Sequence, residues 1–187
     1  MMEFQKNVQS LLPYSRKKYI EMSGWFGVSF QMTGNTKDVI FRDYLEIYEP
    51  WFKSVMSRFG NNSSWIINHE YRDFEWFPNR ENNLASLRAL FKRNKISAKF
   101  KGALVLDKDD LLKFSRDLIS YPYVLFSKHN ILYRDLNISN SELPFIVKIS
   151  GHLNIDLLST DKNLLKEMVI ANSTNDFVIK PYRGTSL

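Results

Sequence analysis

Apolar residues recur at steps of three and four in two long stretches of the chain, and this spacing is typical of amphipathic helices. Residues 36–59 are expected to form the first of these helices. Its buried stripe would consist of seven residues: Phe41, Tyr44, Leu45, Tyr48, Phe52, Val55 and Phe59. Pro50 lacks a backbone N–H, so we expect this helix to kink or restart there. Residues 79–95 predict the second helix, whose inward-facing residues would be Leu84, Leu87, Leu90 and Phe91.

Shorter helices are expected at three other places. Residues 1–22 predict an N-terminal helical extension, because apolar residues recur there at helical spacing: Phe4, Val8 and Leu11. Asp107 is a suitable N-cap for a helix that continues to about residue 120. Thr160 is the expected cap of the last helix, whose inner face would hold Leu164, Leu165, Met168 and Val169.

Alternating apolar and polar residues, which are typical of half-buried strands, mark other segments. Strands are expected over residues 25–32, 63–71, 96–106, 122–127, 130–138 and 176–181. In the strand over residues 96–106, Lys99 and Lys101 would point away from the apolar side. Together with the preceding helix, this strand could gather basic side chains on one surface.

The run over residues 145–157 keeps its apolar residues at odd positions on both sides of Ser150-Gly151. A two-residue hairpin turn at that dipeptide would pair Ile149 with His152 and would mix apolar and polar residues on one face. We therefore expect a single long strand that bends at Gly151.

The element order predicts an α+β fold. Residues 25–94 give β-α-β-α, and residues 96–180 give β-α-β-β-α-β, which resembles a split β-α-β, ferredoxin-like arrangement. A chain of 187 residues suits one domain with a sizeable core. The prediction is therefore a single domain over residues 1–187, with helices packed on a mixed or antiparallel sheet.

Cysteine is absent, which excludes disulfides and thiolate chemistry. The sequence contains no apolar run of membrane-spanning length and no secretory signal, so we expect a cytoplasmic protein with no membrane partner. Asn, Ile, Lys, Phe and Tyr are abundant, whereas Ala and Gly are scarce. This bias towards A/T-rich codons is common in mobile bacterial genes.

The net positive charge of the chain arises from one window of the sequence. Residues 82–106 contain six basic residues and no acidic residue, and the formal net charge of the whole chain is +6, so the remainder of the chain sums to zero. The six residues are Arg88, Lys92, Arg93, Lys95, Lys99 and Lys101. Such a window is typical of a solvated face, a nucleic-acid-binding surface or a surface that meets an acidic protein. Trp76 and Phe77 precede it, and we expect burial in the core unless they serve as interface anchors.

Catalytic motifs are absent from the sequence, which lacks a phosphate-binding loop, a nucleophile elbow and a zinc-protease motif. The best polar constellation is His152, Asn154 and Asp156, which would alternate onto one strand face. These residue types suit acid–base catalysis or half a metal site, but the solvent face of a half-buried strand explains them more simply. Asp107, Asp109 and Asp110 are explained by helix capping. We therefore expect no enzyme activity, no metal and no cofactor.

The functional hypothesis is a non-enzymatic cytoplasmic binding protein of the bacterial immunity or antitoxin type. It would neutralise a toxin by binding an acidic protein surface directly through Arg88, Lys92, Arg93, Lys95, Lys99, Lys101, Trp76 and Phe77. The alternative is a module that binds RNA or single-stranded DNA through residues 88–101.

Overall fold

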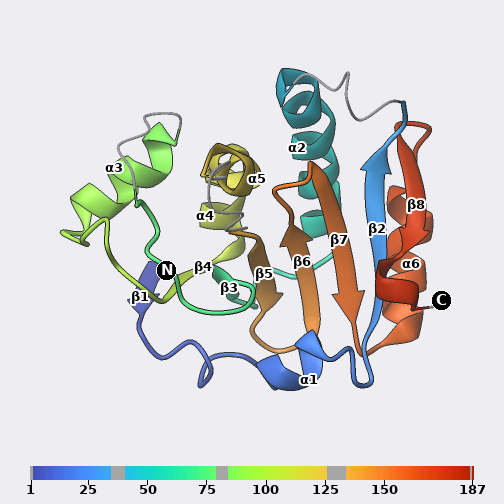
Figure 1. Ribbon diagram of the computed structural model, residues 1–187, viewed down its shortest axis with the longest axis horizontal. Helices are drawn as coiled ribbons and strands as arrows, with labels where there is room; N and C mark the ends of the chain where they lie inside the picture. Colours follow the sequence, from blue (N-terminus) through green and yellow to red (C-terminus); the bar gives the residue numbers. More distant parts are fainter. Residues whose placement is uncertain (1, 35–40, 79–83, 126–133, 186) are drawn as a thin grey trace.

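The structure is a computed structural model that describes residues 2–34, 41–78, 84–125, 134–185 and 187. In these ranges eight strands form one sheet, in which every neighbouring pair is antiparallel (Figure 1). The order across the sheet is β1-β4-β3-β5-β6-β7-β2-β8. The strands are β1 (Met2–Gln5), β2 (Phe26–Met32), β3 (Trp65–His69), β4 (Ala103–Leu106), β5 (Leu136–Asn140), β6 (Phe145–Ile149), β7 (Asn154–Ser159) and β8 (Phe177–Pro181).

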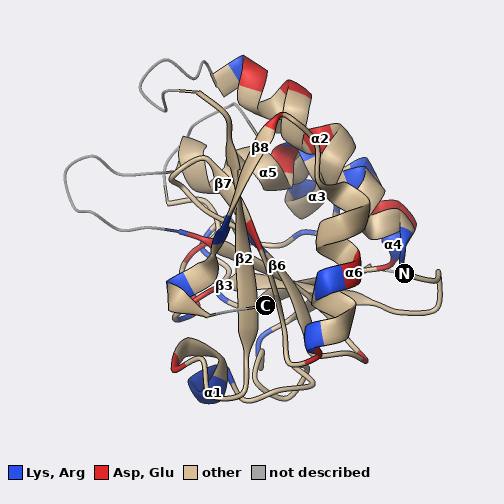
Figure 2. Ribbon diagram, turned by 90° about the vertical axis from the view of Figure 1, so that its right-hand side faces the viewer, with Lys and Arg blue, Asp and Glu red and all other residues tan. Residues whose placement is uncertain are grey.

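The helices divide unequally between the two faces of the sheet. Five of those described cover one face: α2 (Phe41–Ser57), α3 (Ala85–Arg93), α4 (Lys108–Lys113), α5 (Ser115–Val124) and α6 (Lys162–Asn172). Figure 2 shows the sheet nearly edge-on, with these helices on one side and the short helix α1 (Arg16–Ile20) on the other. None of the described helices has the length and hydropathy that a membrane span requires.

The main core lies between the sheet and the five helices. Alternate residues of the central strands point into it, including Ile67, Ile138, Val147 and Leu157, which are all fully buried. Each apolar side chain of this size contributes about 1.5–3 kcal/mol when it leaves water. The opposite face carries two smaller apolar clusters under the N-terminal and C-terminal segments: Tyr19, Trp25, Ile146, Leu158 and Tyr182, and Val8, Leu12, Ile66 and Ala103.

The structure confirms a single α+β domain with an antiparallel sheet. From residue 96 onward its order is β4-α4-α5-β5-β6-β7-α6-β8, so the predicted ferredoxin-like order is not confirmed. Residues 122–125, expected as a strand, belong to the end of α5 and its cap, whereas residues 126–133 lie outside the described residues. Asp161, rather than Thr160, caps α6 by accepting hydrogen bonds from Asn163 N and Leu164 N.

The prediction of helix at the extreme N-terminus is wrong. Met2–Gln5 is a strand, because Met2 and Phe4 pair with Leu106 and Leu104 of β4. Phe4 also packs edge-on against Phe91, with the ring centroids 5.0 Å apart. Within residues 1–22, the α-helical part that the structure describes is α1.

Pro50 does not restart the long helix. Helix α2 continues through it from Phe41 to Ser57. Tyr48, Trp51 and Phe52 are buried in the main core on both sides of the proline, so tertiary packing outweighs the lost hydrogen bond.

Two predicted strands also differ from the structure. Of residues 96–106, the structure assigns only Ala103–Leu106 to a strand, and the chain reaches it through Gly102 at φ +152°. The long strand over residues 145–157 is instead a hairpin of β6 and β7, with Ile149 opposite Ile155. Its turn spans residues 150–153, so odd positions still face odd positions and the apolar faces match without a bend.

Candidate functional site

Five of the six predicted basic residues lie exposed at one end of the molecule. Lys92 and Arg93 belong to the last turn of α3, Lys95 follows the helix, and Lys99 and Lys101 lie in the connection to β4. We call these five residues the basic surface. In the described part of the chain none of them forms an ion pair.

Backbone hydrogen bonds hold the second part of the basic surface in place. Phe77 N donates to Ala98 O at 3.0 Å, and Trp76 N donates to Phe100 O at 3.2 Å. The segment that carries Lys99 and Lys101 is thereby fixed against the core, although it is not a regular strand.

A groove runs beside this segment, with a volume of about 530 Å³. Its lining combines three lysines with two half-buried apolar residues: Lys6, Lys99, Lys101, Ile96 and Phe100, together with Ser97. A basic rim around an apolar floor is suited to contact with a protein whose own surface combines apolar and acidic groups.

Trp76 and Phe77 are core residues, so the basic surface forms without them. Trp76 is fully buried and Phe77 is 4% exposed. Trp76 Nε1 donates to Gly102 O at 3.0 Å, and Phe77 packs edge-on against Phe91 at 5.0 Å. The expectation of burial is confirmed, and the expectation that these rings could anchor a partner is corrected. Arg88 is also drawn inward, with its Cζ 4.4 Å from the Phe77 ring centroid.

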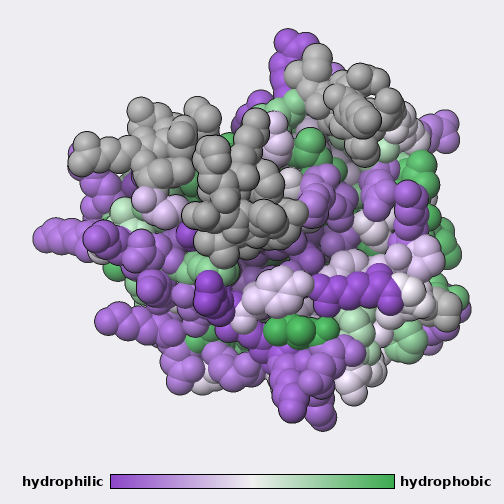
Figure 3. Space-filling view, in the orientation of Figure 1, coloured by the Kyte–Doolittle hydropathy of each residue, from purple (hydrophilic) through white to green (hydrophobic). Residues whose placement is uncertain are grey.

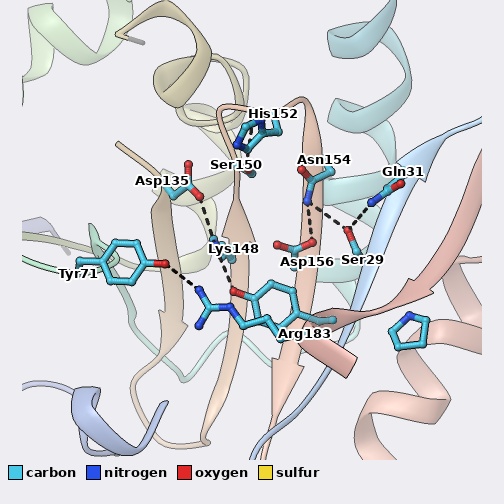
Figure 4. A pocket seen from close by; sticks show the side chains of 12 residues that line it. Ser29, Gln31, Tyr71, Asp135, Lys148, Ser150, His152, Asn154, Asp156 and Arg183 are labelled. Carbon is cyan, nitrogen blue, oxygen red and sulfur yellow. Dashed lines mark hydrogen bonds and ion pairs between the residues drawn. The ribbon is translucent and has the colours of Figure 1, made fainter. Parts of the chain in front are cut away.

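A second site lies on the sheet face opposite the five helices, where a polar pocket of about 430 Å³ opens over β6, β7 and β2 (Figure 4). We call it the sheet pocket. Its lining consists of Ser29, Gln31, Tyr71, Asp135, Lys148, Ser150, His152, Asn154, Asp156, Pro181, Tyr182 and Arg183. In the space-filling view, this face of the molecule carries many hydrophilic side chains around its centre (Figure 3).

Strand alternation explains why these side chains meet. Asp156 of β7 lies opposite Lys148 of β6 and opposite Ser29 of β2. Because neighbouring positions in register point to the same face, the three polar side chains project together. Their sequence neighbours, such as Val147 and Leu157, point to the main core instead.

A buried ionic network forms one wall of the sheet pocket. Lys148 Nζ lies 3.0 Å from Glu70 Oε2 and 3.3 Å from Asp135 Oδ2, and it donates to Tyr182 Oη at 3.1 Å. Burial alone would lower the pKa of Lys148, but Glu70, Tyr182 and Asp135 outweigh it and raise this pKa. These neighbours therefore hold Lys148 in its charged form.

Glu70 connects this ionic network to helix α1 and to the C-terminal segment. It is 1% exposed, and its Oε1 accepts hydrogen bonds from Tyr19 Oη at 3.0 Å and from Arg183 Nη2 at 3.3 Å. Arg183 Nη2 also donates to Tyr71 Oη at 2.7 Å. Helix α1 and the C-terminal segment are thus tied to the sheet through one carboxylate.

Asp156 forms the opposite wall of the sheet pocket. It is 2% exposed, and its Oδ1 accepts a hydrogen bond from Asn154 Nδ2 at 2.7 Å. Asn154 Nδ2 also lies 3.2 Å from Ser29 Oγ. Burial raises the pKa of Asp156 to about 6, although Ser29, Lys148 and Asn154 favour its ionised form.

The sequence had singled out part of this site with the wrong interpretation. Asn154 and Asp156 do share a strand face, but His152 belongs to the turn between β6 and β7. That strand face is not the solvated one that we expected, because Asp156 is buried. Lys148, within the otherwise apolar β6, is the signal that could have revealed the remainder, since a buried lysine requires acidic partners.

Comparison of the chain with protein-family models, with curated proteins and with solved structures gave no match. The function of the protein is therefore inferred from the geometry and charge of the two sites.

Proposed function

We propose that this protein is a non-enzymatic, cytoplasmic binding protein of the bacterial immunity or antitoxin type, which neutralises a toxin by binding an acidic surface of it. The observation that supports this proposal is the basic surface, whose five cationic side chains are exposed and form no ion pair among the described residues. A field of one sign steers a complementary partner and increases the association rate.

The groove next to the basic surface could provide apolar contacts that increase the affinity for a partner. Charged rims give speed and selectivity, whereas most affinity comes from buried apolar and aromatic contacts. Ile96 and Phe100 are partly buried at the floor of the groove, and Lys6, Lys99 and Lys101 surround them. A partner could place an apolar side chain in the groove and its own acidic residues against the surrounding lysines.

Nucleic-acid binding is the competing function for the same surface. Proteins that bind single strands usually combine basic residues with exposed aromatic rings on which the bases stack. The two rings that could have provided such a platform, Trp76 and Phe77, are buried. This observation favours a protein partner over RNA or single-stranded DNA.

Co-expression with the product of the adjacent reading frame tests the proposal. We expect the two proteins to co-purify at low salt, and we expect this protein to relieve any growth arrest that the neighbour causes. Failure to associate at micromolar concentration in low salt would count against the proposal. In a parallel assay, retardation of labelled RNA or single-stranded DNA, with an affinity that falls steeply as salt is added, would support the alternative.

A further inference from the structure

The sheet pocket contains a buried carboxylate, Asp156, that forms no ion pair among the described residues. In the described part of the chain, no Lys, Arg or His nitrogen lies within 4.0 Å of the Asp156 carboxylate. Lys148, the cation opposite it in register, is directed to Glu70 and Asp135 instead. Asp156 therefore lines the pocket with an amide and a hydroxyl as its neighbours.

The ionic groups at the sheet pocket are unevenly paired. Lys148 and Arg183 pair with Glu70, and Lys148 also pairs with Asp135, whereas Asp156 forms no ion pair among the described residues. A buried charge without a counterion destabilises a fold, so stability alone gives no reason for Asp156. Such groups in a concave pocket are typical of binding sites.

We propose that the sheet pocket binds a small organic cation, with an ammonium group that pairs with the Asp156 carboxylate. The ligand would give Asp156 the ion pair that it lacks among the described residues. Its other polar groups would meet the neutral donors and acceptors of the lining: Ser29, Gln31, Ser150, Asn154 and Tyr182. A hydroxylated amine, such as an amino sugar, has this combination of groups.

The dimensions and residue types of the pocket limit the ligand further. A volume of about 430 Å³ lies in the range of small-molecule sites, which is about 300–1,000 Å³. The ionised Asp156 carboxylate, which has no direct ion pair among the described residues, disfavours phosphates and other anions. A divalent metal is also disfavoured, because the described residues contain no group of three side chains suited to hold one.

Titration with glucosamine tests the proposal, with glucose as the uncharged probe of similar shape. We expect the wild-type protein to bind glucosamine at least about tenfold more tightly than glucose at pH 7, where the amine and Asp156 are both mainly charged, measured by calorimetry. Asp156→Asn should abolish this preference, because it removes the charge and keeps the shape. Glu167→Gln changes an exposed carboxylate on α6, outside the sheet pocket, and should leave binding unchanged.

Two further measurements keep the test independent of any variant. Amide chemical shifts of wild-type protein should move on addition of glucosamine at Ser29, Asn154 and Asp156, and not along α3. Binding should weaken as the pH falls below about 6, where Asp156 becomes protonated. The other charged or titratable groups that line the sheet pocket or lie in register with it are Lys148, Asp135, His152, Tyr71, Tyr182, Arg183 and Lys180. The pH dependence should be lost in Asp156→Asn, which separates the titration of Asp156 from that of these groups.

Equal binding of glucosamine and glucose, full binding by Asp156→Asn, or no shift at the sheet pocket would overturn the proposal. It would also be overturned if inorganic phosphate bound there more tightly than glucosamine. The proposal does not rest on the basic surface, so it can fail or stand independently of the proposed toxin partner.

Discussion

At the scale of single residues, the face of the sheet opposite the five helices combines two small apolar clusters with a group of buried charges. Glu70, Lys148, Asp135 and Asp156 are each less than 10% exposed. Lys148 forms ion pairs with both Glu70 and Asp135, whereas Asp156 does not take part in these ion pairs. Removal of the charge of Lys148 should therefore lower the free energy of unfolding, whereas removal of the charge of Asp156 should raise it.

Replacement of Lys148 by methionine should destabilise the protein by about 3–5 kcal/mol. The change keeps most of the side-chain volume but leaves Glu70 and Asp135 buried without their shared cation. Denaturant unfolding at pH 7 measures the effect. Lys166→Met, at an exposed position of α6, should change the free energy of unfolding by less than about 0.5 kcal/mol. A similar small effect for both variants would show that the network does not stabilise the fold.

Asp156→Asn should do the reverse and raise the free energy of unfolding by about 2 kcal/mol at pH 8. The pKa of Asp156 is about 6 in the folded state and 3.8 as its ordinary value, so ionisation costs the folded state more than the unfolded state. The stability that protonation confers is complete below pH 3.8 and is lost as the pH rises through 6. The gain from the variant should therefore shrink between pH 7 and pH 4. A gain that does not change with pH would contradict the assigned pKa.

At the scale of elements, the sequence predicted those strands and helices in which one local pattern dominates. Strands β2, β3 and β8 and helix α2 were identified because their apolar periodicity agrees with their burial. Strand β1 was missed because four residues are too few to distinguish the two periods, and its pairing partner lies about 100 residues away. The hairpin of β6 and β7 was missed because a four-residue turn keeps the same alternation that a continuous strand would have.

The candidate sites could be predicted to a different extent. The five residues of the basic surface lie close together in the sequence, so the window of basic residues was enough to predict them. The sheet pocket combines residues of β2, β6, β7 and the end of β8 with Tyr71, Asp135 and the C-terminal segment. Its residues lie up to 154 positions apart, from Ser29 to Arg183, and no local pattern carries that information.

The connection that leads to β4 depends on Gly102. Its φ of +152° is unfavourable for other residues, and a Cβ at this position would clash with the backbone oxygen of Gln5 on β1. Gly102→Ala should lower the free energy of unfolding by about 2 kcal/mol or more, which thermal or denaturant unfolding will measure. Gly60→Ala has open space around it and should change the same quantity by less than about 0.5 kcal/mol. Equal effects would show that β1 does not pack against this turn.

At the scale of the whole molecule, the two candidate sites lie on different parts of one sheet. The basic surface is at the end formed by α3, β1 and β4, and the sheet pocket lies over β6, β7 and β2 (Figure 1). The net charge of +6 is concentrated in the window that contains the basic surface. The rate at which a partner associates should therefore depend on the positions of the cations as well as on their number.

Two variants with the same net charge separate the effect of the position of the cations from the effect of their number. In the first, the five residues of the basic surface are replaced by glutamine. In the control, five exposed cations elsewhere are replaced in the same way: Lys17, Lys18, Arg58, Lys166 and Lys180. Each set removes five of the six net positive charges, so both variants have a formal net charge of +1.

The association rate of these two variants with the product of the adjacent reading frame, measured at low and high salt, is the most direct test of the proposed function. We expect the basic-surface variant to associate at least about tenfold more slowly than wild type at low salt, with little dependence on salt. The control variant should retain most of the wild-type rate and its salt dependence. Equal rates for the two variants would contradict a partner-binding role for the basic surface.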